Sequence, residues 1–235
     1  MPTYLAIPND TLFFRGGEPM GMGESHFQTS IFPPSSETFI GAIRTLIIAR
    51  NSSGDFGGYK NGNYNDTDWF KEIGFMELPD SFKFTGPFLK KGNIPLFSPP
   101  ANLFAASDKG KFAVAVPKHL NEVKHSSKLE NIMWIDKNDD IDSSDWKPVE
   151  DYITLSGMEK YLRSSIASLN RDDFIRSCDI FENEKRTGIA LNKGLRTAKE
   201  RHLYMTTHKR FKENAGMVFH LDGASSFPDS NILQL

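Results

Sequence analysis

The strongest constraint on the fold is a helix start at residues 33–37, with the sequence Pro-Pro-Ser-Ser-Glu. Prolines followed by a serine cap and a carboxylate in the first turn are typical of the beginning of an α-helix. The residues that follow carry one apolar stripe at the 3.6-residue period, formed by Phe39, Ile40, Ile43, Leu46 and Ile47. The pattern stops at the run Asn-Ser-Ser-Gly at 51–54. We therefore expect an amphipathic helix between these two signals.

Most of the remaining chain predicts short strands and turns. Short apolar or alternating runs indicate strands, and residues 82–92 predict a strand, a turn and a second strand. The other expected strands lie at 4–7, 112–116, 152–155, near Ile180 and at 217–221. Helices are expected at 68–73 and 157–169, a long ordered loop at 9–34 and an acidic loop at 136–145. This order favours an α+β fold of the ferredoxin-like type.

The composition of the 235 residues is that of a globular chain, with a quarter of the residues charged. A single cysteine, Cys178, cannot form an internal disulfide or complete a structural zinc site, which favours a reducing, cytoplasmic compartment. The N-terminus has no signal-peptide pattern, and the longest apolar run, 46–49, is far too short to span a bilayer. Nineteen phenylalanines must mostly fill the core. The six histidines show no metal-ligand spacing, so we expect neither a metal nor a cofactor.

The charge is strongly polarised along the sequence. Residues 185–212 contain nine basic side chains and one acidic side chain, a formal charge of +8, so the rest of the chain must carry −10 to give the net −2. A field of this density attracts a polyanion such as RNA. The alternative is a solvated basic surface without a partner.

Four motifs, in order along residues 10–220, resemble those of subunit three of the Cmr (type III-B) CRISPR effector complexes, a protein of the RAMP superfamily. The first two are Asp-Thr-Leu-Phe-Phe-Arg-Gly-Gly-Glu-Pro at 10–19 and Phe-Pro-Pro-Ser at 32–35, which runs into Thr-Phe-Ile-Gly-Ala-Ile-Arg-Thr at 38–45. The others are Gly-Pro-Phe-Leu at 86–89, with Pro-Pro at 99–100, and Glu-Lys-Arg-Thr-Gly-Ile-Ala-Leu at 184–191, with Arg-Thr-Ala at 196–198 and Leu-Tyr at 203–204. Gly16 departs from the family pattern, in which an aspartate is common.

The resemblance implies a RAMP fold, ferredoxin-like and similar to an RRM, with long loop insertions. It divides the chain into a first ferredoxin-like unit at 1–120 and an insertion with a partial second unit at 121–235. Family members usually continue to a second glycine-rich element, which does not follow here. We therefore expect an incomplete second unit, either because the gene is split and a separate chain supplies the missing element, or because the protein is truncated.

The resemblance also implies a non-catalytic RNA-binding subunit for antiviral defence. Its expected partners are the repeat-derived 5′ handle of the crRNA, the large polymerase-like Cas subunit, other Cmr RAMP subunits and, indirectly, the target RNA. No membrane partner is expected.

Three features near the N-terminus are candidate RNA contacts. In Arg15-Gly16-Gly17, glycines allow close backbone approach and the guanidinium can clamp a phosphate; the alternative is pairing of Arg15 with Glu18 or Glu24. The serines Ser35 and Ser36 stand at a helix N-terminus, which binds anions, but they also serve as simple caps. Arg44 faces either RNA or an ion pair within the fold.

The basic segment supplies the remaining candidates. Glycines among them allow sharp turns, Tyr204 can stack on a base, and protonation of His202 or His208 would add charge. Glu184 is expected to orient Arg186. The candidate contacts in this segment are Lys185, Arg186, Lys193, Arg196, Arg201, His202 and Tyr204.

An enzyme is the competing functional class, because some RAMP proteins cleave precursor crRNA with a histidine acid/base. His26 lies in the first loop, but no second histidine or tyrosine is obviously partnered with it. Acid–base cleavage needs two placed groups. We therefore favour the non-catalytic interpretation.

Overall fold

We analysed a computed structural model of the chain, which describes residues 2–17, 27–106, 110–119, 131–135, 145–191, 194, 197–228 and 232–234. Two compact units divide the chain, one formed by residues 1–92 and 180–235 and the other by residues 93–179. The boundary expected at residue 120 thus falls inside the second unit. The reason is that the C-terminal part of the chain returns to pair with the N-terminal strands.

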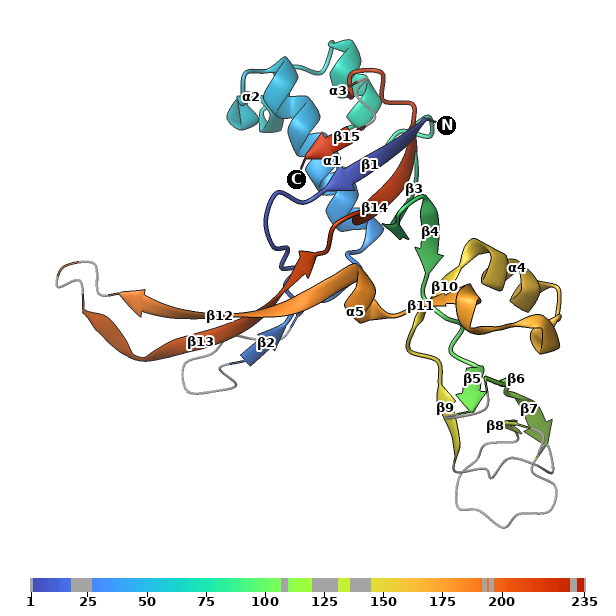
Figure 1. Cartoon of the computed structure of the whole chain (residues 1–235). Helices are drawn as coiled ribbons and strands as arrows, with labels where there is room; N and C mark the ends of the chain where they lie inside the picture. The colour runs from blue at the N-terminus through green and yellow to red at the C-terminus, as the bar shows by residue number, and fades with distance from the viewer. Residues whose placement is uncertain are drawn as a thin grey trace. The chain divides into compact units, whose positions relative to one another are not determined.

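In the first unit, four strands lie side by side in a sheet, in the order β3-β14-β1-β15 (Figure 1). β14 is antiparallel to both β1 and β3, whereas β15 is parallel to β1. The bounds are β1 Thr3–Ile7, β3 Lys83–Lys91, β14 Ala215–Asp222 and β15 Ile232–Gln234. The expected strands at 4–7 and 217–221 are therefore confirmed. The fold is α+β, while its ferredoxin-like detail stays a prediction, because a regular βαββαβ sheet would have its last strand antiparallel to β1.

The helix α1, Ser36–Asn51, confirms the helix-start signal. Ser35 is its N-cap and accepts a hydrogen bond from the backbone N–H of Thr38 at 3.3 Å. Its buried face is close to the predicted stripe, with Ile48 added and with Ile40 and Leu46 outside the fully buried set. The fully or nearly buried residues are Phe39, Ile43, Ile47 and Ile48. Two short helices follow, α2 Phe56–Lys60 and α3 Asp68–Ile73.

The core of this unit forms between α1 and the sheet around Phe219, which is fully buried. Its ring lies 5.4 Å from that of Tyr4, 5.5 Å from that of Phe84 and 5.6 Å from that of Phe39. Aromatic residues from three strands and the helix thus meet at one point, as the high phenylalanine content predicted.

Residues 83–91 form one continuous strand, so the turn predicted within residues 82–92 does not interrupt it. Gly86 has φ +122° and lies opposite the register shift between Val218 and His220. A Cβ at Gly86 would lie 3.1 Å from the Val218 carbonyl oxygen. Glycine therefore allows β3 to pass an irregularity in the ladder without ending.

A long antiparallel hairpin extends from the sheet of the first unit (Figure 1). It consists of β12, Phe181–Leu191, and β13, Ala198–Phe211, and the short strand β2, Phe27–Thr29, pairs with β13 in parallel. The sequence had predicted a strand only near Ile180. The basic segment is therefore mostly β-hairpin.

In the second unit, β11, β10 and β4 are neighbouring strands in that order, and two small sheets have the orders β6-β5-β9 and β7-β8. Its core cluster consists of Leu103, Ile153 and Leu169. The strands are β4 Ile94–Phe97, β5 Leu103–Ala106, β6 Phe112–Val114, β7 Val116–His119, β8 Asn131–Trp134, β9 Trp146–Pro148, β10 Tyr152–Thr154 and β11 Phe174–Ile175. The helical segments are α4 Leu155–Leu162, η2 Ile166–Ser168 and η3 Arg171–Asp173, and α5 Ser177–Ile180 leads into β12.

The helix α4 is shorter than the predicted 157–169, because Ser164 has φ +57°, a left-handed conformation that ends an α-helix. Most of the predicted acidic loop, residues 136–144, lies outside the described residues. No helix in the described ranges is both long and apolar enough to cross a membrane.

Candidate nucleic-acid interface

The two strands of the hairpin present alternate side chains on each face, because side chains in a strand point to opposite sides in turn. On one face, four cross-strand pairs follow one another along the hairpin. These pairs are Gly188–Tyr204, Arg186–Thr206, Glu184–His208 and Glu182–Arg210. Four residues of the motif at 184–204, Glu184, Arg186, Gly188 and Tyr204, therefore lie together on this face.

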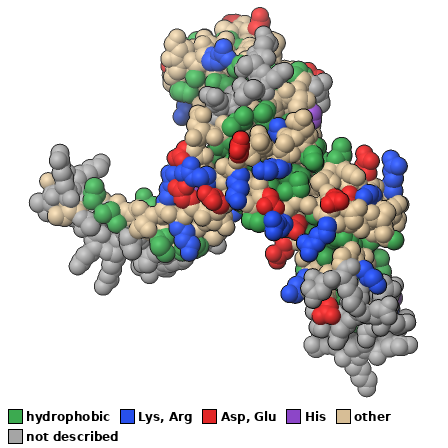
Figure 2. All heavy atoms as spheres, viewed as in Figure 1, with side chains coloured by type: hydrophobic (Ala, Val, Ile, Leu, Met, Phe, Trp, Pro, Cys, Tyr) green, Lys and Arg blue, Asp and Glu red, His purple; other side chains and the backbone are tan. Residues whose placement is uncertain are grey.

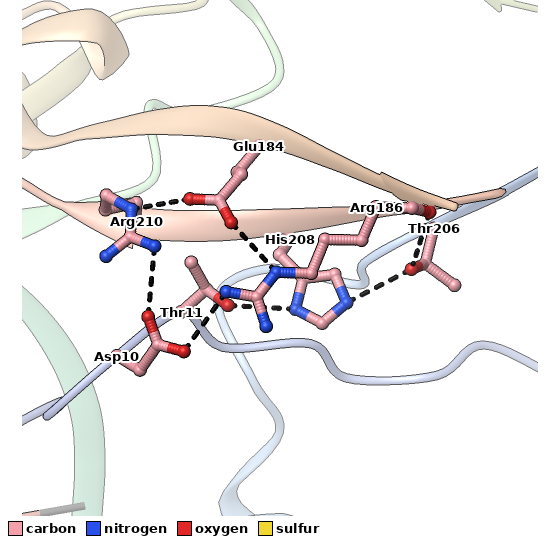
Figure 3. Close-up of polar contacts among 7 residues, drawn as sticks. All are labelled: Asp10, Thr11, Glu184, Arg186, Thr206, His208 and Arg210. Carbon is pink, nitrogen blue, oxygen red and sulfur yellow. Dashed lines mark hydrogen bonds and ion pairs between the residues drawn. The ribbon is translucent and has the colours of Figure 1, made fainter. Parts of the chain in front are cut away.

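Two arginines and two carboxylates form a closed ring near the root of the hairpin (Figure 3). Glu184 accepts from Nε of Arg186 at 2.8 Å and from Nε of Arg210 at 2.6 Å. Asp10, from the segment after β1, accepts from Nη2 of Arg186 at 3.1 Å and from Nη2 of Arg210 at 3.0 Å. Each carboxylate thus bridges both guanidiniums, and Glu184 orients Arg186 as predicted.

The ring changes the charge that the sequence suggested for this segment. In Figure 2 acidic and basic side chains lie next to one another around the root of the hairpin, so this face is not uniformly basic. Arg210 and Arg186 lower the pKa of the Glu184 carboxyl, and Arg186 does the same for the pKa of Asp10. Both carboxylates therefore stay ionised and offset two of the positive charges. Each arginine keeps its Nη1 group without a hydrogen bond to any other described residue.

His208 connects the first loop to the same face. Its Nδ1 is 3.0 Å from the hydroxyl of Thr11, its Nε2 is 3.1 Å from the hydroxyl of Thr206, and the ring of Phe13 stacks on it at 5.1 Å. Burial, with Arg186 nearby, lowers the pKa of His208, so the ring is neutral at neutral pH and does not add the charge expected from its protonation. Backbone hydrogen bonds of 2.9 and 2.8 Å between Leu12 and Lys209 complete the attachment.

An aromatic cluster supports the opposite face at the hairpin root. The ring of Phe32 contacts Phe181 at 4.9 Å and Phe211 at 5.7 Å, both edge to face. The Nζ of Lys209 lies 4.7 Å from the Phe181 ring centroid and donates to Asn183 at 2.6 Å. Burial also lowers the pKa of Lys209. This lysine therefore belongs to the packing of the hairpin and not to an open basic surface.

The N-terminal candidates differ in how far the fold already uses them. Arg15 is exposed, and no other described residue bonds to its guanidinium; Glu18 and Glu24, its alternative partners, lie outside the described residues. Ser35 caps α1, and Ser36 donates to the carbonyl of Gly86 at 2.6 Å. The RNA contacts proposed for them, and for Gly16 and Gly17, stay predictions.

Arg44 makes hydrogen bonds within the fold. Its Nη2 donates to the hydroxyl of Tyr59 at 2.8 Å, to the carbonyl of Gly74 at 3.0 Å and to the carbonyl of Phe75. The partners are one hydroxyl and two backbone carbonyls, all neutral, so these hydrogen bonds take the place of the ion pair that was the alternative to an RNA contact. These contacts favour the structural interpretation of Arg44.

The candidates in the hairpin are only partly described. Lys185 is exposed on the face opposite the ring, and Tyr204 lies on the same face as the ring. The backbones of Arg201 and His202 belong to β13, but their side chains lie outside the description, as do Lys193, Arg196 and His26 entirely. In the described part of the chain, no group of three or more His, Cys, Asp or Glu side chains could hold a metal ion.

Sequence reasoning missed Asp10, Phe13 and Arg210 as parts of this surface. The period-2 spacing of 204, 206, 208 and 210 is a signal that could have placed Arg210, together with His208, on the face of Tyr204. No comparable local signal connects Asp10 to them. It could be found only from the fold.

Comparison with known proteins identifies the class and then the family. The family model described as "CRISPR-associated protein (Cas_Cmr3)" matches residues 4–235, nearly the whole chain, so the chain is a CRISPR-associated protein. The chain belongs to the Cas_Cmr3 family, which confirms the resemblance found in the sequence motifs. No curated protein sequence matches the chain.

Two solved structures are similar over part of their length. One is a chain of the cryo-EM structure of Type III-B Cmr-beta bound to cognate target RNA and AMPPnP, state 1, with 18% identity, a TM-score of 0.38 and coverage of 92% of this chain and 52% of that chain. The other is a chain of Type III-B Cmr-beta bound to cognate target RNA, with 17% identity, a TM-score of 0.45 and coverage of 94% and 54%. The chain therefore spans about half the length of the structures it matches.

Proposed function

We propose that this chain is a non-catalytic RNA-binding subunit of a type III-B CRISPR interference complex and acts in antiviral defence. The observation that carries this proposal is the family match over residues 4–235. In the complex the chain holds the repeat-derived 5′ handle of the crRNA. It connects that handle to the large polymerase-like subunit and to other RAMP subunits, and it meets the target RNA only indirectly.

Two surfaces of the chain contact different parts of the RNA. The exposed Arg15, beside Gly16 and Gly17, grips the handle, together with the start of α1. The hairpin contacts the adjacent RNA backbone, because it carries Lys185, Arg186 and the basic residues of its distal part. Arg15 is the sharpest probe of the first surface, since no described partner holds it.

The test compares two RNAs of equal length, one with the handle and one unrelated. Arg15→Ala should weaken binding of the handle-bearing RNA more than binding of the other, whereas Arg50→Ala, an exposed arginine at the end of α1, should change neither. Equal weakening for both RNAs would reduce Arg15 to general charge and end the handle assignment.

A second measurement addresses the hairpin. Neutralising Arg186, Lys193, Arg196 and Arg201 together should flatten the salt dependence of binding, by roughly 0.7 in the log–log slope for each phosphate that the protein no longer neutralises. An unchanged slope would make the hairpin a solvated surface. Incubation with repeat-containing RNA tests the enzymatic alternative, and the non-catalytic proposal expects the RNA to stay intact.

A further inference from the structure

A groove crosses the ring-bearing face of the hairpin beyond the arginines. Its floor is the Arg186–Thr206 pair, one end is Tyr204 above Gly188, and the other end is Phe13 on His208. Its volume is about 500 Å³, within the range of sites for small organic groups. The groove therefore combines two aromatic walls with a floor that includes the side chain of Arg186.

Tyr204 occupies the space that the missing side chain of Gly188 leaves. The two residues are direct cross-strand partners, and a Cβ at Gly188 would overlap the Cζ and Oη atoms of the tyrosine. The ring thus covers the backbone of β12 at Gly188, and such coverage by a cross-strand aromatic ring compensates for a glycine in a sheet. Tyr204 nevertheless stays 39% exposed, so part of its surface is open to a ligand.

The opposite wall, formed by Phe13 and His208, is held in place by hydrogen bonds and stacking. The ring of His208 is fixed between the hydroxyls of Thr11 and Thr206, and Phe13 stacks on it with 24° between the planes. Tyr204 and His208 are four residues apart on one strand, so their Cα atoms are about 13 Å apart at roughly 3.3 Å per residue. The small side chain of Thr206 lies between them on the strand, and a groove of about 500 Å³ has room for a planar aromatic group.

Charge complementarity indicates what that group carries. Arg186 is 41% exposed in its side chain, and Glu184 and Asp10 occupy only its Nε and Nη2 groups. Its remaining guanidinium donors suit a phosphate oxygen next to the groove. A planar aromatic ring attached to a phosphate is a nucleotide, and stacking on aromatic side chains is the usual way to bind an unpaired base.

We propose that this groove holds one unstacked nucleobase of single-stranded RNA against Tyr204, with the phosphate of the neighbouring nucleotide on Arg186. The proposal rests on the RNA-binding function proposed above and assigns a base-stacking role to the Phe13–Tyr204 groove. Because every base has an aromatic face, the groove selects for an unpaired nucleotide and not for one sequence.

The experiment measures binding of the full chain to a fluorescently labelled handle-bearing RNA, with wild type and three variants. Tyr204→Leu should weaken binding about 10-fold, which corresponds to about 1.4 kcal/mol and lies within the range for stacking of one base. Gly188→Ala should act in the same direction by displacing the tyrosine ring. Met205→Ala is the matched control, since Met205 is the next residue, lies on the opposite face and is 37% exposed; it should change affinity less than about twofold.

A scan of single abasic positions along the RNA then locates the bound base. At that position, removal of the base should weaken binding by the wild type about as much as Tyr204→Leu weakens binding of the intact RNA. Removal of the same base should not weaken binding by the Tyr204→Leu variant any further. If the wild type binds RNA but Tyr204→Leu and Gly188→Ala behave as Met205→Ala, the groove is not a base site, while the proposed function stands. If the wild type binds no RNA, both proposals fail. Thermal unfolding identifies a misfolded variant, in which case the other variant decides.

Discussion

Removing the buried ring of Phe181 should destabilise the root of the hairpin, and with it the face of the hairpin that is proposed to bind RNA. Phe181 is 7% exposed, contacts Phe32 and Phe211 edge to face, and lies under the ammonium of Lys209. A buried Phe→Ala change costs about 3–5 kcal/mol in the free energy of unfolding. Because Phe181 begins β12, we expect a value near the middle of this range for Phe181→Ala.

Two controls separate the ring from simple apolar volume. Phe181→Leu keeps most of the volume and should cost less than about 1.5 kcal/mol, so the difference reports the aromatic contacts. Phe56→Ala removes a ring that is 41% exposed on α2 and should cost less than about 1 kcal/mol.

Hydrogen exchange of the backbone amides shows where stability is lost. In Phe181→Ala, protection should fall along β12 and β13, while β5 in the second unit should keep its protection. RNA affinity should fall with it, because the same hairpin carries Arg186 and Tyr204. A Phe181→Ala protein that is as stable as Phe56→Ala and equally protected in the hairpin would refute the idea that this cluster anchors it.

Three further predictions address other contacts. Burial lowers the pKa of His208 below its ordinary 6.5, so the unfolded chain binds a proton at a higher pH than the folded chain does. The stability that His208 contributes above about pH 6.5 is therefore lost as the pH falls toward the folded pKa, and His208→Gln should remove this part of the loss. Parallel pH profiles of the melting temperature for the wild type and the variant would contradict this. Arg44→Met should lower the free energy of unfolding by about 1–3 kcal/mol without a separate loss of RNA affinity, whereas a stable variant that binds RNA poorly would make Arg44 a contact. Asp173 is 4% exposed and pairs with Lys160 at 2.8 Å, so Asp173→Asn should cost about 3 kcal/mol and reduce exchange protection of α4 but not of the hairpin; reduced protection in the hairpin would show coupling that the contacts do not predict.

The sequence by itself determined the features that depend on neighbouring residues. The start of α1 followed from a local proline–serine signal, and its buried stripe followed from the helical period, because both act within one or two turns. The family followed from short motifs in a fixed order. The pairing of Glu184 with Arg186 was also predicted, because the two residues are two positions apart in one motif.

Only the tertiary structure decided the surface that these motifs build. Asp10 and Arg210 are 200 positions apart, yet they share a hydrogen bond of 3.0 Å, because β1 and the hairpin converge in one unit. The basic residues of the segment divide between two faces of a hairpin, so a count along the sequence could not show that carboxylates offset two arginines. Similarly, the groove between Tyr204 and Phe13 exists because cross-strand register places Gly188 opposite the tyrosine, and register depends on the pairing of strands and not on either strand alone.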